Sequence, residues 1–70
     1  MIYEVEEGKT YLSPSSKPFK VLHIGKHGQN CSCPMIVYTN LEETDLPPGQ
    51  IWVIEESLFL KLFSEQEEGP

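Results

Sequence analysis

The chain contains no arginine, and its basic side chains are few and scattered. The five lysines are Lys9, Lys17, Lys20, Lys26 and Lys61. Proteins that bind nucleic acid or anionic membranes depend on clustered basic side chains that contact phosphates. Eleven carboxylates against five lysines give a net charge of −6. We therefore expect neither a nucleic-acid partner nor a membrane partner, and a basic protein partner is easier to accommodate.

Long apolar runs and cysteines are also scarce. No run approaches the ~18 apolar residues that a membrane-spanning helix needs, and the acidic stretch Met1–Glu7 lacks the apolar segment of a signal peptide. These absences predict a cytoplasmic protein. The only cysteines, Cys31 and Cys33, are separated by one residue. A structural disulfide between them is not expected in a reducing compartment.

A length of 70 residues is enough for a single domain and no more. We predict that residues 1–64 form this domain and that the acidic residues 65–70 form a disordered tail. Three stretches rich in glycine, proline, serine or asparagine divide the domain: Ser13–Pro18, Gly25–Pro34 and Pro47–Gly49.

Short runs rich in β-branched and aromatic residues lie between these turns. They are Thr10–Leu12, Phe19–Ile24, Met35–Thr39 and Ile51–Ile54. This composition favours strands. Met35–Thr39 is expected to be an edge strand that could pair two copies, so the chain is predicted to be a monomer or a weak homodimer.

The last segment admits two interpretations. Leu58, Phe59, Leu62 and Phe63 share one face of a helix, but Leu58, Leu60 and Leu62 also alternate as in a strand. We predict one helical turn over residues 56–59 and a closing strand over residues 60–64, with a helix of two to three turns as the alternative. The whole pattern predicts an all-β fold, a small SH3-like barrel of four to five antiparallel strands with one short helical turn near the C-terminus.

An ordered set of short motifs resembles a known family. The motifs are Gly8-Lys9-x-Tyr11, Phe19–Ile24, Lys26-His27, Ile36-Val37-Tyr38, Ile51-Trp52-Val53 and Leu58-Phe59. Their order resembles the small bacterial family called domain of unknown function 1653, over roughly Gly8 to Phe63. The resemblance implies a short SH3-like barrel and no assigned activity. Where that family has Arg-Pro after Trp-Val, this chain has Ile54-Glu55, so an anion-binding role for the arginine does not carry over.

Aromatic and acidic residues provide the main functional hypothesis. The candidate binding residues are Tyr11, Tyr38, Trp52, Glu42, Glu43 and Asp45. Aromatic rings beside carboxylates suit a lysine- or arginine-bearing peptide. In the plainer interpretation, the aromatic residues fill the core and the charged residues only solvate the surface. We expect Ile51 and Val53 to face the interior and Trp52 to be partly exposed. The predicted function is a non-enzymatic interaction module with an acidic, aromatic-lined surface, no cofactor and a protein partner.

A second hypothesis uses soft ligands. His23, His27, Cys31 and Cys33 lie within eleven positions, which suggests a metal-binding or thiol-reactive protein. The Cys-x-Cys spacing is tighter than in usual zinc sites. A nucleophilic cysteine beside His27 and Asn30 would lack the fixed geometry and oxyanion hole that such catalysis needs. A third hypothesis is an acidic inhibitor that mimics nucleic acid.

Overall fold

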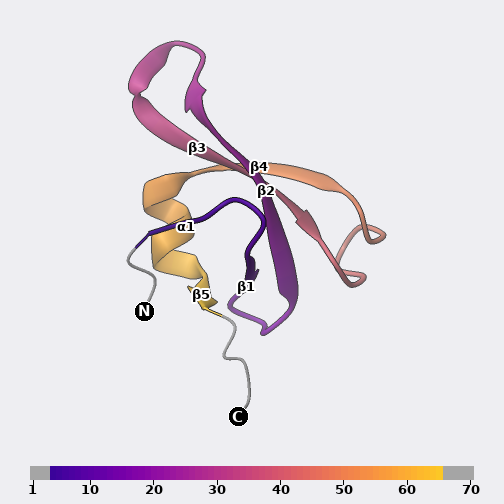
Figure 1. The fold of residues 1–70 in the computed structure, drawn as a ribbon. Helices are drawn as coiled ribbons and strands as arrows, with labels where there is room; N and C mark the ends of the chain where they lie inside the picture. The colour runs from indigo at the N-terminus through magenta and orange to yellow at the C-terminus, as the bar shows by residue number, and fades with distance from the viewer. Residues whose placement is uncertain (1–3, 66–70) are drawn as a thin grey trace.

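A computed structural model describes residues 4–65. Their strands form one antiparallel sheet in the order β4-β3-β2-β1-β5 (Figure 1). The elements are β1 (Thr10–Leu12), β2 (Pro18–His27), β3 (Asn30–Asn40), β4 (Ile51–Glu55), α1 (Glu56–Leu62) and β5 (Ser64–Glu65). No helix in this part of the chain is long and apolar enough to cross a membrane.

The predicted β architecture is confirmed at the level of five antiparallel strands and one short helix. The closed barrel is not confirmed, because β4 and β5 are the two edges of an open sheet. Met35–Thr39 is a strand as predicted, but its predicted position at an edge of the sheet is wrong, since β3 lies between β4 and β2. Glu65 pairs with Tyr11 through β5, while the rest of the predicted tail lies outside the described residues.

The predicted loop over residues 25–34 is a long hairpin instead. His27 pairs with Asn30, so only Gly28 and Gln29 make the turn, and Figure 1 shows this hairpin projecting from the top of the molecule. Its residues are mostly exposed. Exposed strand residues need no apolar alternation, and for this reason the polar sequence alone predicts a loop.

The predicted strand over residues 60–64 is wrong for Leu60–Leu62, and the longer helix is right, because α1 continues to Leu62. The four-residue spacing of Phe59 and Phe63 lets both rings face the sheet, where they stack with centroids 4.2 Å apart. Glu56 in the first turn and Lys61 in the last turn suit the helix dipole.

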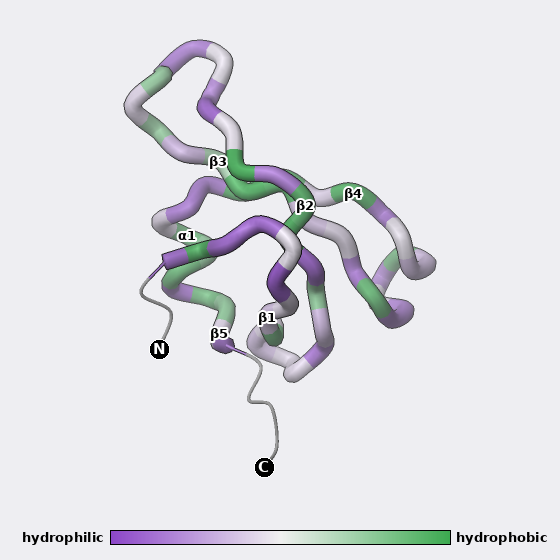
Figure 2. Tube along the Cα trace, in the orientation of Figure 1, coloured by the Kyte–Doolittle hydropathy of each residue, from purple (hydrophilic) through white to green (hydrophobic). Residues whose placement is uncertain are grey.

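A mostly aromatic core lies between α1 and the sheet. Tyr11 from β1, Phe19 from β2 and Tyr38 from β3 make edge-to-face contacts with Phe59 of α1 or with Phe63 directly after it, at 5.3 to 5.7 Å between ring centroids. Figure 2 shows hydrophobic residues along α1 and in the middle of the sheet. The buried hydrophobic residues are Val5, Tyr11, Phe19, Val21, Ile36, Tyr38, Phe59 and Phe63.

Candidate functional site

A pocket of about 710 Å³ lies between the β1–β2 loop and the β3–β4 loop. Pockets of a few hundred to a thousand Å³ are the usual size for small ligands and peptide side chains. Its lining residues are Ser13, Ser15, Lys17, Phe19, Tyr38, Glu43, Thr44, Asp45 and Trp52. Four of the six predicted binding residues lie together here: Tyr38, Glu43, Asp45 and Trp52.

Three strands supply the aromatic side of the pocket. Tyr38 on β3 pairs with Trp52 on β4, and its ring meets that of Phe19 on β2 with centroids 5.5 Å apart. Phe19 and Tyr38 are largely buried, whereas Trp52 is half-buried and packs against the core. The indole of Trp52 is therefore the aromatic group of this pocket that a ligand reaches most readily.

The buried side chain of Asn40, 1% exposed, holds the tryptophan and the acidic loop together. Its Oδ1 accepts hydrogen bonds from Trp52 Nε1 at 3.3 Å and from the Gln50 backbone N–H at 3.0 Å. Its Nδ2 donates to the carbonyl oxygens of Glu42, Leu46 and Pro47 at 2.9, 3.2 and 3.1 Å. One amide thus fixes the indole relative to the loop that carries Glu43 and Asp45.

The predicted Pro47–Gly49 turn closes the same loop. Gly49 has a φ of +90°, which is a conformation that favours glycine. Its N–H donates to the carbonyl oxygen of Asn40 at 3.0 Å. The chain therefore returns into β4 beside Asn40, and this turn fixes the position of Trp52 in the pocket.

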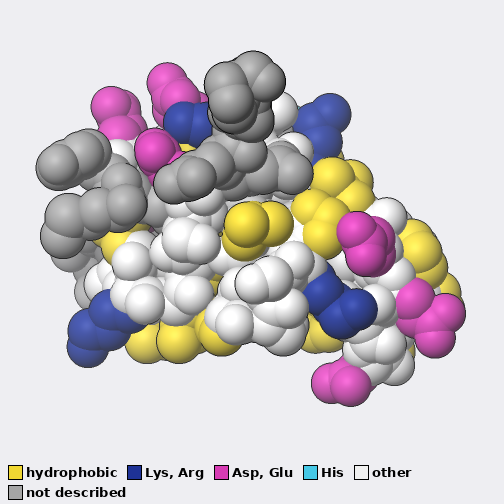
Figure 3. Space-filling view, turned by 90° about the horizontal axis from the view of Figure 1, so that it is seen from below, with side chains coloured by type: hydrophobic (Ala, Val, Ile, Leu, Met, Phe, Trp, Pro, Cys, Tyr) yellow, Lys and Arg dark blue, Asp and Glu magenta, His cyan; other side chains and the backbone are white. Residues whose placement is uncertain are grey.

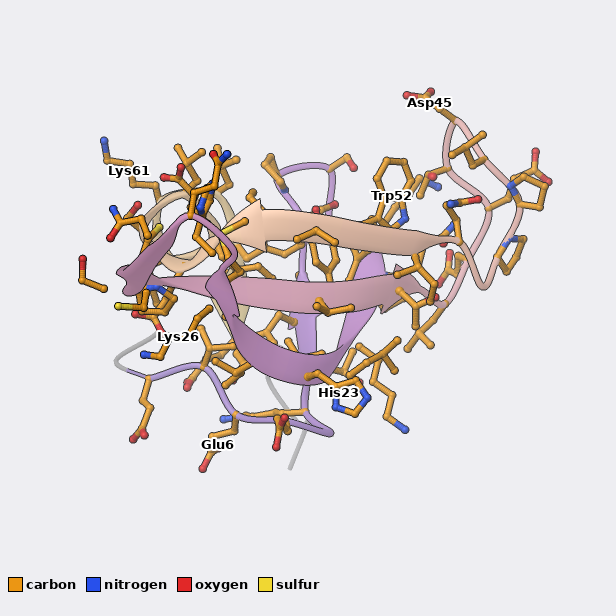
Figure 4. The ribbon with its side chains drawn as sticks, turned by 90° about the horizontal axis from the view of Figure 1, so that it is seen from above. Glu6, His23, Lys26, Asp45, Trp52 and Lys61 are labelled. Carbon is orange, nitrogen blue, oxygen red and sulfur yellow. The ribbon has the colours of Figure 1, made fainter. Side chains whose placement is uncertain are left out.

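Charge of both signs lines the pocket. Glu43 and Asp45 are exposed on the β3–β4 loop, and Lys17 lies on the β1–β2 loop. Lys17 forms no ion pair with either carboxylate, so both remain available to a ligand. Figure 4 shows Trp52 beside the loop that carries Asp45, and Figure 3 shows acidic side chains next to hydrophobic surface on the side of this loop.

The Tyr38 hydroxyl is a further polar group of the pocket. Burial raises the pKa of this phenol above its ordinary 10.0. No side-chain hydrogen bond within residues 4–65 involves this hydroxyl. A ligand in the pocket could therefore use it as donor or acceptor.

Two predicted binding residues lie elsewhere. The placement of Tyr11 on the binding surface is wrong, because its side chain is fully buried in the core. Its Oη accepts a hydrogen bond from the Glu6 backbone N–H at 2.9 Å and donates to the Glu4 carbonyl oxygen at 3.4 Å. Glu42 is exposed next to the pocket but does not line it.

The predicted facing of β4 is also wrong, although the predicted partial exposure of Trp52 is found. Ile51 and Val53 are 52% and 60% exposed, and Trp52 and Ile54 pack against the core. Trp52 is drawn inward because it pairs with Tyr38, whose side chain belongs to the core. Phe19, Lys17 and Asn40 also belong to the site but are not among the predicted residues. Of these, only Phe19 carries a signal in the sequence, its alternation with Val21.

The histidines and cysteines do not form a metal site in the described residues. His23 lies 3.7 Å from Glu7 Oε2, and His27 Nδ1 accepts a hydrogen bond from the Gln29 backbone N–H. Within residues 4–65 no three histidine, cysteine or acidic side chains are placed to hold a metal ion. Cys31 and Cys33 are both free thiols on β3, so the metal hypothesis gains no support.

Comparison with known proteins found no matching family model, no similar curated protein and no similar solved structure. The resemblance to the domain of unknown function 1653 therefore remains a prediction. Function has to be inferred from the pocket itself.

Proposed function

We propose that the protein is a non-enzymatic interaction module that binds a lysine- or arginine-bearing peptide segment in the pocket between the β1–β2 and β3–β4 loops. The observation that carries the proposal is the placement of the Trp52 indole and the carboxylates of Glu43 and Asp45 around one cavity. A bound cation is attracted both to the face of an aromatic ring and to nearby carboxylates.

The remaining charges support a cationic ligand of defined orientation. A net charge of −6 attracts a basic partner over a distance. Lys17 on the opposite loop repels a second cation at its own side of the pocket. The bound cation is therefore expected on the side of Glu43 and Asp45, with the Tyr38 hydroxyl available for a polar contact.

An SH3-like barrel is the architecture that we propose for this module. The strands follow one another as antiparallel neighbours from β1 to β4, and after the short helix β5 returns beside β1. Small β-barrels of this kind bind extended peptides in aromatic-lined grooves between loops. The location of the pocket between two loops is consistent with this mode of binding.

A fluorescence titration tests the proposal, because Trp52 is the single tryptophan of the chain. We use two peptides that differ only in a central lysine or glutamine. The lysine peptide is expected to change the emission of Trp52 at lower concentration than the glutamine peptide. Equal responses to both peptides, or no response, would contradict the proposal.

A pair of double variants with equal net charge provides the control. Glu43→Gln with Asp45→Asn removes the pocket carboxylates, whereas Glu4→Gln with Glu6→Gln removes two exposed carboxylates elsewhere. Figure 4 shows Glu6 on the opposite side of the molecule from Trp52. The first pair is expected to abolish the preference for lysine, and the second to retain most of it. An equal loss in both would mean that only the net charge matters.

A further inference from the structure

Strand β4 has a free side. The sheet order places β4 at one edge, paired along its whole length with β3 from Ile51 to Glu55. On its other side no strand of residues 4–65 pairs with it. In a strand, alternate residues direct their N–H and C=O groups to opposite sides. Part of the β4 backbone therefore faces away from β3 without a strand partner.

β4 carries one of the usual protections of an edge strand, the charged side chain of Glu55 at its end, but no lysine, proline or β-bulge. Natural edge strands carry lysine, proline or a β-bulge, or are very short. The other edge, β5, has only two residues. By contrast, β4 has five residues with the sequence Ile-Trp-Val-Ile-Glu, and its register with β3 contains no shift. Ile51 and Val53 are also more than half exposed, so this edge is open to pairing with another chain.

The free strand is continuous with the pocket. Trp52 belongs to β4 and lines the pocket, while Ile51 and Val53 point to the opposite face of the sheet. A strand added along β4 would therefore place alternate side chains on the pocket side, near Trp52. Its other side chains would extend the apolar face beside Ile51 and Val53.

The charges around β4 favour a basic segment over a second copy of this chain. Glu43 and Asp45 lie in the loop before the strand, and Glu55 and Glu56 lie at its end. Antiparallel pairing of two copies centred on Val53 would set Glu55 of each chain opposite Ile51 of the other, and so place a carboxylate against an apolar side chain. It would also bring together two molecules that each carry a charge of −6. A segment that alternates basic and apolar residues meets neither difficulty.

The geometry points to strand addition: a basic, extended segment of a partner protein pairs through its backbone with the free side of β4 and places a lysine or arginine into the pocket beside Trp52. This inference rests on the proposed function and adds the mode of binding. Main-chain hydrogen bonds supply affinity in such complexes, and the pocket selects the side chain.

Backbone methylation of a peptide tests the inference. The probe is a short peptide that alternates lysine and valine, used in three forms: unmodified, N-methylated at the lysines, and N-methylated at the valines. In an added strand only one of the two residue types directs its N–H groups to β4. One methylated peptide is therefore expected to lose affinity about tenfold or more, and the other to stay within about threefold of the unmodified peptide.

Hydrogen exchange of the β4 amides gives a second readout on the same samples. Alternate amides of Ile51–Glu55 are expected to exchange more slowly when the unmodified peptide is bound. Equal affinities of the two methylated peptides, with a normal Trp52 response and unchanged amide exchange, would overturn strand addition and leave the pocket intact.

Two other outcomes would also overturn the inference. If the unmodified peptide causes no Trp52 response, the pocket and the strand addition fail together. If the chain alone sediments as a dimer whose β4 amides are already protected, the edge is occupied by a second copy, not by a basic segment.

Discussion

Asn40 connects the two halves of the candidate site through a single side chain. The sequence does not predict Asn40 as a site residue, because an asparagine at a strand end normally indicates only a turn. Its function depends on five partners that are brought together by the β3–β4 loop. Trp52 and the acidic residues, in contrast, could be predicted from residue type alone, since large aromatics and clustered carboxylates stand out in a short chain.

Replacing Asn40 is expected to loosen the loop and the indole together. Asn40→Ala should lower the free energy of unfolding by about 2 kcal/mol, because buried hydrogen bonds are lost while water reaches part of the loop. Urea denaturation measures the loss, and Trp52 emission should shift to the red. Asn30→Ala is the control, since the side chain of Asn30 is exposed and, within residues 4–65, bonds only Ser32. Its effect should stay within about 0.5 kcal/mol. Equal effects of the two variants would contradict the role of Asn40.

Tyr38 is expected to couple stability to alkaline pH. Burial raises the pKa of its phenol above the ordinary 10.0, so the unfolded chain releases this proton at a lower pH than the folded one. The folded state then binds more protons above pH 10, and stability falls as pH rises through that range. Tyr38→Phe should remove the part of this alkaline loss of stability that comes from the Tyr38 phenol. It should change stability little near neutral pH. Parallel stability curves for the two proteins between about pH 8 and about pH 11 would contradict the assignment.

At the scale of elements, α1 covers the aromatic end of the sheet. Residues 58–63 admit both a strand and a helix in the sequence, and local patterning could not decide between them. Tertiary packing decides, because only the helix brings Phe59 and Phe63 together against Tyr11 and Tyr38. The strands were easier to predict, since β-branched runs between turns have few alternatives. Their pairing and the facing of β4 depend on long-range contacts that no local window contains.

The packing of α1 predicts a large difference between neighbouring helix residues. Phe59→Ala should lower the free energy of unfolding by about 3 to 5 kcal/mol, because a fully buried ring is removed. That is much of the stability of so small a domain, and the variant is expected to be largely unfolded by circular dichroism. Leu58→Ala removes an exposed side chain, and its cost should be below about 1 kcal/mol. A folded Phe59→Ala variant would contradict the helix as a core element.

At the scale of the whole molecule, a small core and a strong negative charge occur together. The core is mostly aromatic, and the half-buried Trp52 extends it to the surface at the pocket. The chain has eleven carboxylates, and among those of residues 4–65 only Glu43 and Asp45 line the cavity. Composition could therefore predict only the sign of the charge that the proposed partner would carry, whereas the location of the pocket required the structure.

The distribution of charge predicts salt-dependent binding. Raising the ionic strength from about 0.05 M to about 0.5 M should weaken binding of the lysine peptide several-fold, because exposed charges are screened. The Glu43→Gln and Asp45→Asn double variant should show a smaller dependence. Isothermal titration at the two salt concentrations measures both. A salt dependence that is the same in the double variant would assign it to the overall charge and not to the pocket.

The central claim is that a cationic side chain binds beside Trp52. Nuclear magnetic resonance tests it most directly, because the chain has one tryptophan and therefore one indole N–H signal. When the lysine peptide is titrated into ¹⁵N-labelled protein, we predict shifts of the Trp52 indole signal and of the amides of Glu43, Thr44 and Asp45. The glutamine peptide should cause markedly smaller shifts at the same concentration. Shifts confined to the β2–β3 hairpin or to α1, or equal shifts with both peptides, would contradict the claim.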